Sequence, residues 1–266
     1  MTTTFVRDRF TWLAYFMLAY FSFMQSSLGP LTPFLRADLH LNYSETGLHL
    51  SAFAFGMIIA GLSAERVTAR WGRRAVFWGG ALGLGFGGVL LTLGRSVIFT
   101  VPSALIMGFL GAYLLVMIPA CLTDHHGSQR AIALTESNVA ASISATLAPL
   151  FVGIGETIGL TWRFGLLVGA GICLVLAVVF RKTPIPAEVK RAQTQASRPL
   201  PRRFWAYWLV VVFAVSLEWC MVFWGADFLQ NSVGLEKVTA STLMSVFFVA
   251  MVIGRVIGSR LTRTVE

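Results

Sequence analysis

The 266-residue chain is 56% hydrophobic and 12% charged, with a mean hydropathy of +0.73 and a formal net charge of +9. A soluble domain of this size needs far more charge to cover its surface, so the composition excludes an ordinary water-soluble protein. The basic residues fall between apolar runs and do not interleave with aromatic residues. They therefore indicate orientation in a membrane and argue against a nucleic-acid partner.

Eight apolar runs predict eight membrane-spanning helices. The runs cover residues 10–35, 44–64, 75–94, 97–122, 131–155, 162–180, 204–229 and 239–259. About 20 apolar residues cross a hydrocarbon core of about 30 Å, and lipid favours helices because they satisfy their own backbone groups. The first run is too long for a signal peptide, so we expect it to be retained. Cys121, Cys173 and Cys220 lie inside these runs, which predicts buried free thiols.

The Lys and Arg residues between the runs predict the orientation. With a cytoplasmic N-terminus, 16 of the 21 basic residues fall in cytoplasmic segments. Arg36, Arg95, Arg163 and Lys237 then lie outside, and Arg255 lies within the last run. Because Lys and Arg accumulate in cytoplasmic loops, we expect the N-terminus to be cytoplasmic. We expect the protein to be integral to a membrane, the inner membrane of a prokaryotic cell.

A linker and an internal repeat divide the chain. Residues 181–203 contain four prolines and seven basic residues, which favours a cytoplasmic linker between two helical bundles. Shifting the sequence by 194 residues aligns the first two runs with the last two without a gap, with 12 identities that include Arg9 with Arg203. Parallel repeats of this kind are a transporter architecture. We therefore predict a six-helix bundle over 1–180, the linker, and the start of a second bundle over 204–266.

Four motifs resemble the major facilitator superfamily. They are Gly-Pro-Leu-Thr-Pro-Phe-Leu at 29–35, Ala-Arg-Trp-Gly-Arg-Arg at 69–74, Pro149 with Gly153, and Thr-Trp-Arg at 161–163. The resemblance implies an all-α polytopic bundle with twelve spans, of which the first, fourth and seventh line a central cavity. This chain would supply the complete N-terminal bundle and two helices of the C-terminal one. We expect a fragment, or otherwise a truncated product, because Arg260 and Arg263 end the chain where the segment at 65–74 would repeat.

The segment at 65–74 departs from the family pattern. Ala69 stands where the family usually has Asp, and Glu65 stands where it usually has Gly. In the family that Asp helps to lock one conformation against the second bundle, and Glu65 lies one helical turn earlier. A loop that acts as a conformational gate is therefore predicted, with the residues Glu65, Arg66, Arg70, Gly72, Arg73 and Arg74. The alternative is that Glu65 only pairs with a nearby arginine. Ala148 replaces an expected Gly before Pro149, so the direction of transport does not follow.

Ionisable residues inside a span are expensive and are functional candidates. Glu218 lies midway along the seventh run and Glu136 early in the fifth, so we predict that they bind a proton or a cationic substrate. Further candidates for contact with a substrate are Asn138, Gln25, Tyr20, Tyr113, Trp224 and Asp227. The alternative for each is a structural role in helix packing.

The leading hypothesis is a secondary transporter that works by alternating access with proton coupling, or a uniporter. Its partners would be the lipid bilayer, a small-molecule substrate and protons. A membrane-embedded enzyme and a non-transporting sensor remain as alternatives. The sequence has no Walker motif, and Asp124-His125-His126 is better explained by interfacial anchoring than by a metal site, so we expect no cofactor or metal. A drug, a sugar and an organic anion stay open as substrates, although the lack of a mid-span Lys or Arg weighs against the anion.

Overall fold

Long helices joined by short turns make up the chain. The computed structural model describes residues 5–187 and 201–265, with side chains described as far as Gly254. In chain order the helices are α1 (Arg9–Asp38), α2 (Tyr43–Leu93), α3 (Val97–His126), the 3-10 turn η1 (Gly127–Gln129), α4 (Arg130–Thr157), α5 (Arg163–Phe180), α6 (Arg202–Asn231) and α7 (Lys237–Val265). No strand occurs within these described ranges, so the prediction of an all-α polytopic bundle is confirmed.

Helix α2 contains two of the predicted spans and kinks between them at Gly72. Gly72 has φ 78° and ψ 156°, a conformation that glycine adopts without the penalty of a side chain. Residues 65–71 are helical, so the interpretation of 65–74 as a loop was wrong for most of its length. Its Ala, Glu and Arg residues have high helix propensity, and only the glycine interrupts the helix.

Within the described residues, five helical stretches are long and apolar enough to cross a membrane. The stretches Tyr43–Leu93 and Val97–Thr157 each hold two predicted spans, so seven of the eight predicted spans are included. Helix α1 is not among them. Its Tyr, Ser and Gln residues lower its hydropathy, and most of its residues are buried by the surrounding helices. The first predicted span therefore lies at the centre of the bundle and has little contact with lipid.

Helices α2 and α3 pack closely because glycines lie at their contact. A methyl group built on Gly80 would lie 2.8 Å from the Leu114 nitrogen, and one on Gly108 would lie 2.1 Å from the Phe53 carbonyl oxygen. Small residues allow this close approach between membrane helices. The glycine-rich part of the third predicted span thus contributes to helix packing.

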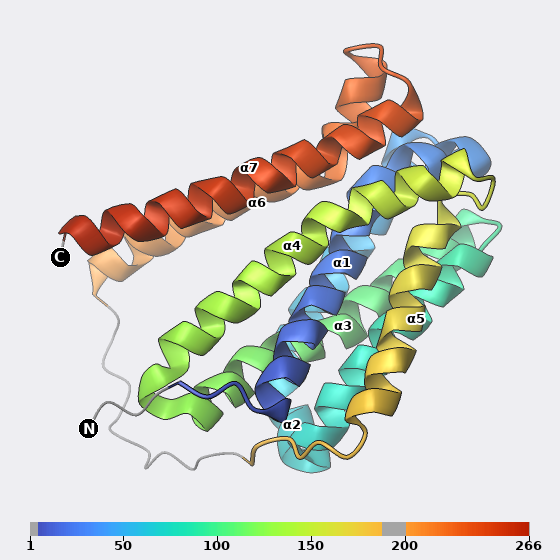
Figure 1. Cartoon of the computed structure of the whole chain (residues 1–266). Helices are drawn as coiled ribbons and strands as arrows, with labels where there is room; N and C mark the ends of the chain where they lie inside the picture. Colours follow the sequence, from blue (N-terminus) through green and yellow to red (C-terminus); the bar gives the residue numbers. More distant parts are fainter. Residues whose placement is uncertain (1–4, 188–200, 266) are drawn as a thin grey trace.

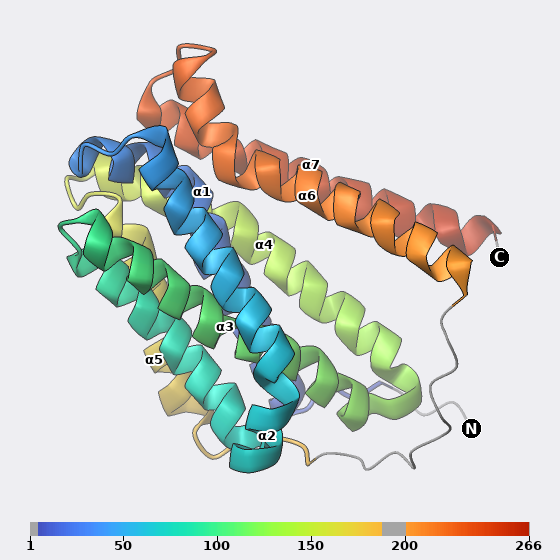
Figure 2. The ribbon, with the colours of Figure 1, turned by 180° about the vertical axis from the view of Figure 1, so that it is seen from behind.

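Helices α6 and α7 run side by side along one flank of the bundle (Figure 1). They meet α1 and α4 near the end of α6 and diverge from them toward the two chain termini, as the reverse view also shows (Figure 2). The residues of α6 are accordingly exposed from 202 to 217, whereas Val222, Gly225, Ala226 and Asp227 are buried. Cys220 is exposed on α6, so the prediction of a buried thiol was wrong there; Cys121 and Cys173 are buried.

The helix bounds agree with the internal repeat. Helices α1 and α6 each have 30 residues, and α7 begins at Lys237, 194 residues after the start of α2 at Tyr43. The division into two bundles stays a prediction. Most of the linker predicted at 181–203 lies outside the described residues, as do the side chains of Arg260 and Arg263.

Candidate functional site

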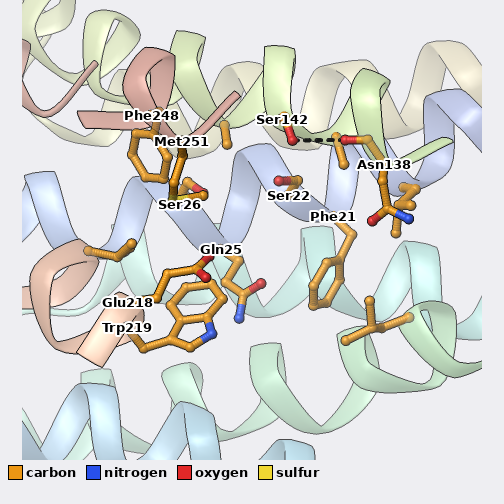
Figure 3. A pocket seen from close by; sticks show the side chains of 15 residues that line it. Phe21, Ser22, Gln25, Ser26, Asn138, Ser142, Glu218, Trp219, Phe248 and Met251 are labelled. Atoms are coloured by element: carbon orange, nitrogen blue, oxygen red, sulfur yellow. Dashed lines mark hydrogen bonds between the residues drawn. The ribbon is translucent and has the colours of Figure 1, made fainter. Parts of the chain in front are cut away.

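A cavity of ≈ 140 Å³ lies where the helix pair α6–α7 begins to diverge from the bundle. Five helices line it: α1, α3, α4, α6 and α7. Its polar lining residues are Ser22, Gln25, Ser26, Asn138, Ser142 and Glu218; its apolar ones are Leu18, Phe21, Leu115, Ala141, Ala145, Trp219, Val222, Phe248 and Met251 (Figure 3).

Two helices of the bundle supply the neutral polar wall. Ser22, Gln25 and Ser26 are three and four residues apart on α1, which places them on one face of that helix. Asn138 and Ser142 lie one turn apart on α4, where the Ser142 hydroxyl donates a hydrogen bond of 2.9 Å to the Asn138 carbonyl oxygen. The Gln25 amide also contacts the Met57 sulfur at 3.8 Å.

The opposite wall comes from the middle of α6. Glu218 and Trp219 are both half-buried there. Figure 3 shows the Glu218 side chain extending toward Gln25, with the Trp219 ring beside it. Glu218 is the one ionisable residue among the described residues that line the cavity, and none of those residues is Lys, Arg or His. The cavity thus combines a carboxyl group, neutral hydrogen-bonding groups and aromatic rings.

Of the residues predicted from the sequence, Glu218, Gln25 and Asn138 meet in this cavity. Glu136 does not line it. Arg7 donates to the two Glu136 carboxylate oxygens at 2.6 and 2.8 Å, and the Tyr15 hydroxyl donates to one of them at 3.0 Å. Because Glu136 precedes Asn138 by two residues, the two side chains leave α4 in nearly opposite directions.

Both predicted tyrosines lie within the bundle and do not line the cavity. The Tyr20 hydroxyl donates to the Ala81 carbonyl oxygen at 3.2 Å, and that of Tyr113 lies 2.8 Å from the Ser63 hydroxyl. Both contacts therefore fit the alternative of a structural role in helix packing. Ser22 and Ser26 also line the cavity but were not among the candidates, although their spacing from Gln25 on one helical face is visible in the sequence.

Trp224 and Asp227 lie beyond the cavity, where α6 packs on α1 and α2. Asp227 forms an ion pair with Arg36 at 2.5 Å, and the Arg36 guanidinium also stacks 4.3 Å from the centre of the Tyr43 ring. The Trp224 ring would lie 3.7 Å from a methyl group on Gly47. These two predicted residues therefore join helices, and neither lines the cavity.

The backbones also come close at this end of the molecule. A methyl group on Gly29 of α1 would lie 1.9 Å from the Val222 carbonyl oxygen of α6, and one on Gly153 of α4 would lie 2.7 Å from the Thr242 hydroxyl of α7. We call this region, with the Arg36–Asp227 pair, the closed end. It holds the helix pair against the bundle on one side of the cavity.

The predicted gate residues lie at the other end of the bundle. Arg73 pairs with Asp124 at 2.7 Å, and Arg74 donates to the carbonyl oxygens of Arg181 and Thr183 at 2.6 and 3.3 Å. The remaining three charged members, Glu65, Arg66 and Arg70, are exposed and form no hydrogen bond or ion pair within the described part of the chain. The gate stays a prediction.

Asp8 and Thr11 connect the start of α1 to the end of α3. His125 lies 2.7 Å from an Asp8 carboxylate oxygen, and His126 lies 2.8 Å from the Thr11 hydroxyl. Burial raises the pKa of Asp8, but hydrogen bonds from Thr11 and His125 outweigh it and lower that pKa overall. Burial and the neighbouring His125 lower the pKa of His126. These histidines therefore stabilise the fold at the predicted cytoplasmic side.

Comparison with known proteins points to one family. The model of the major facilitator superfamily matches residues 11–266. None of the curated protein sequences matches the chain. A crystal structure of a mutant peptide transporter, POT, in complex with sulfate is similar with a TM-score of 0.55 and 18% sequence identity. The similarity covers 90% of this chain and 49% of that one, so the chain spans about half the length of the solved transporter. At this identity the likeness shows the fold alone.

Proposed function

This chain belongs to the major facilitator superfamily, and we propose that it acts in secondary transport of a small solute by alternating access. The observation that carries the proposal is the position of the cavity, between the bundle and the diverging helix pair α6–α7. Family membership favours transport over the alternatives of a membrane enzyme or a sensor. The protein is integral to a membrane, as its apolar helices require.

The two helix groups have the arrangement that alternating access needs. Rocking one group against the other around a fixed site exposes that site to each side in turn. Here the groups touch at the closed end and diverge at the other. With the N-terminus in the cytoplasm, as the basic residues predict, the diverging end faces inward. The conformation is then the inward-open one of the cycle.

Glu218 is our candidate for proton coupling. A carboxyl group in a membrane interior changes the charge of its surroundings by one unit when it binds a proton, and it can therefore favour one conformation over another. Glu218 lines the cavity, and it lies on α6, one of the two moving helices. Glu136 is bound by Arg7 and Tyr15, so we assign it a structural role. In a uniporter, transport would not depend on a proton bound to Glu218.

Uptake into proteoliposomes tests the proposal. The full-length protein is reconstituted and a panel of labelled solutes is offered with and without an imposed pH gradient. We expect the gradient to drive accumulation of one solute class, and Glu218→Gln to abolish that drive while solute exchange persists. Glu236→Gln, an exposed acid before α7, is the matched control and should behave as wild type. If every solute enters proteoliposomes and protein-free liposomes to the same extent, the transport proposal is contradicted. Intact gradient-driven uptake in Glu218→Gln would remove the coupling role.

A further inference from the structure

We propose that the protein binds the headgroup of an anionic phospholipid at an exposed surface where the kink of α2 meets the end of α5. We call this surface the basic patch; its residues are Arg66, Arg70, Trp71, Arg74, Arg181 and Lys182. The patch lies at the diverging end of the bundle, and its residues do not line the cavity. The inference goes beyond the proposed function and does not depend on it, because it concerns the surrounding lipid and not the solute.

Hydrogen bonds join the two helices that form the patch. The Arg74 guanidinium donates to the Arg181 carbonyl oxygen at 2.6 Å and to the Thr183 carbonyl oxygen at 3.3 Å. Both views of the ribbon show the kink of α2 beside the end of α5 (Figures 1 and 2). Arg66 and Arg70 lie one turn apart on one face of α2, just before its kink. The patch therefore extends from the last turn before the kink to the end of α5.

The charge of the patch is strongly one-sided. Residues 65–74 and 181–187 together contain six basic residues and one acidic residue, Glu65. One of the six, Arg73, pairs with Asp124, and the other five are exposed. These five exceed the single acid by four positive charges. Such an excess attracts an anionic partner, and added salt weakens the attraction.

The depth of the patch identifies the partner as a lipid. The predicted spans 44–64 and 162–180 end directly before it, and the span 75–94 begins directly after Arg74. The patch therefore lies where the hydrocarbon core meets the headgroups. Trp71 is 67% exposed there, and tryptophan is enriched at this interfacial depth. An anionic group at this depth belongs to a phospholipid, whose glycerol and first acyl carbons can also contact the indole.

Arginine suits a phosphate group, because its guanidinium can donate two parallel hydrogen bonds to phosphate oxygens. Arg74 already donates to two carbonyl oxygens of the chain. We therefore assign the phosphate to Arg66 and Arg70, with Arg181 and Lys182 adding to the attraction. A basic residue near an anionic membrane surface strengthens binding by about fivefold, so the two arginines together account for about 25-fold.

The closed end supplies the contrast. Arg36 pairs there with Asp227, and Arg163 pairs with Asp38 at 2.6 Å. Arg95 is exposed at that end, between two predicted spans, and provides a matched control at headgroup depth. With the N-terminus in the cytoplasm, as the basic residues predict, the patch faces the inner leaflet, whose anionic lipids attract basic residues.

Brominated lipids test the contact, because bromine quenches the fluorescence of a nearby indole. The full-length protein is placed in nanodiscs of phosphatidylcholine that contain increasing fractions of phosphatidylglycerol, with bromine near the headgroup end of one lipid or the other. The difference between wild type and Trp71→Phe isolates the quenching of Trp71. We expect phosphatidylglycerol to associate at the patch about tenfold more strongly than phosphatidylcholine at low salt, and the preference to shrink at high salt.

Variants assign the preference to the arginines. Arg66→Gln combined with Arg70→Gln should lower the preference for phosphatidylglycerol at least fivefold. Arg66→Lys combined with Arg70→Lys keeps both charges and should retain most of it. Arg95→Gln removes one charge at the other end and should leave it unchanged. Native mass spectrometry counts the bound phosphatidylglycerol molecules in each variant, and a thermal melt checks that each variant is folded.

Three results would overturn the inference. The first is equal association of the two lipids with wild type, which would show that the patch is not open to lipid in the full-length protein. The second is an unchanged preference in the Arg66→Gln and Arg70→Gln double variant, or an equal loss in Arg95→Gln. The third is displacement of phosphatidylglycerol by millimolar glycerol phosphate, which would assign the patch to a soluble anion. None of these measurements requires a solute, so the transport proposal stands or falls separately.

Discussion

Arg36 at the end of α1 and Asp227 near the end of α6 form an ion pair of 2.5 Å in which the side chains are 15% and 9% exposed. Asn231 also donates to an Asp227 carboxylate oxygen at 3.0 Å, one turn farther along α6. The pair joins the bundle to the helix pair at the closed end, which must separate if the cavity is to open on that side. Its strength should therefore affect the balance between the two conformations.

Removing this ion pair should favour the alternative conformation. Arg36→Gln leaves Asp227 partly buried without its partner, and a change of about 1–2 kcal/mol shifts a two-state equilibrium by about 5–30-fold. Spin labels at His40 and Glu236, both exposed near the closed end, report the separation of the two groups. We expect a second, longer distance to appear. The charge-swapped variant R36D/D227R should recover part of the short distance; equal distributions in wild type and Arg36→Gln would argue against the pair's role.

A methyl group at Gly29 should prevent the closed end from forming. It would lie 1.9 Å from the Val222 carbonyl oxygen, far inside van der Waals contact, so α1 and α6 must separate. With the same spin labels, Gly29→Ala should lose most of the short distance. Gly61→Ala is the control, because a methyl group on that helical glycine meets nothing within 4 Å. An unchanged distance in Gly29→Ala would show that this contact is not needed.

Acid should destabilise the link between α1 and α3 in two steps. The pKa of His126 is lowered on folding, so below about pH 6.5 the unfolded chain binds more protons and stability falls as the pH drops. The pKa of Asp8 is also lowered, so its stabilising contribution is present at neutral pH and is lost as the pH falls through that lowered value. Apparent melting temperatures between pH 7.5 and 3.5 measure both steps.

His126→Gln should reduce the loss of stability between pH 6.5 and 5 and leave the loss at lower pH. Asp8→Asn should do the reverse. The melting temperature of His126→Gln falling as steeply as that of wild type between pH 6.5 and 5 would show that another group titrates there.

Two substitutions distinguish a gating role from a structural role for the residues at 65–74. Arg73→Ala removes one partner of Asp124 and should lower the melting temperature, because losing one member of a largely buried ion pair destabilises the fold. Glu65→Gln changes an exposed side chain and should leave the melting temperature unchanged. If Glu65 supplies the missing gate carboxylate, the same variant alters the transport rate. Wild-type transport by Glu65→Gln would exclude that role and leave the arginines as structural residues.

Local patterns in the sequence predicted the helices and part of the site, but they did not predict which residues would meet across helices. Hydropathy located the spans, and the cost of a charge in lipid singled out Glu218, which lines the cavity. The same rule selected Glu136, whose side chain leaves α4 on the other face and binds Arg7, 129 residues away in sequence. Asp227, also a candidate for contact with a substrate, pairs with Arg36 of α1. Whether such a residue lines the cavity depends on the face of the helix from which its side chain leaves and on a partner far away in the sequence. Both are determined by how the helices pack.

The most direct test of alternating access is the reactivity of a cysteine at the cavity wall. Ser22→Cys in an otherwise cysteine-free chain is labelled by an impermeant maleimide from each side of sealed, oriented vesicles, in the wild-type and Gly29→Ala backgrounds. We expect labelling from the diverging side in the first background. In Gly29→Ala, labelling should decrease from that side and increase from the side of the closed end. Labelling that rises from both sides together, or that stays on one side in both backgrounds, would contradict alternating access.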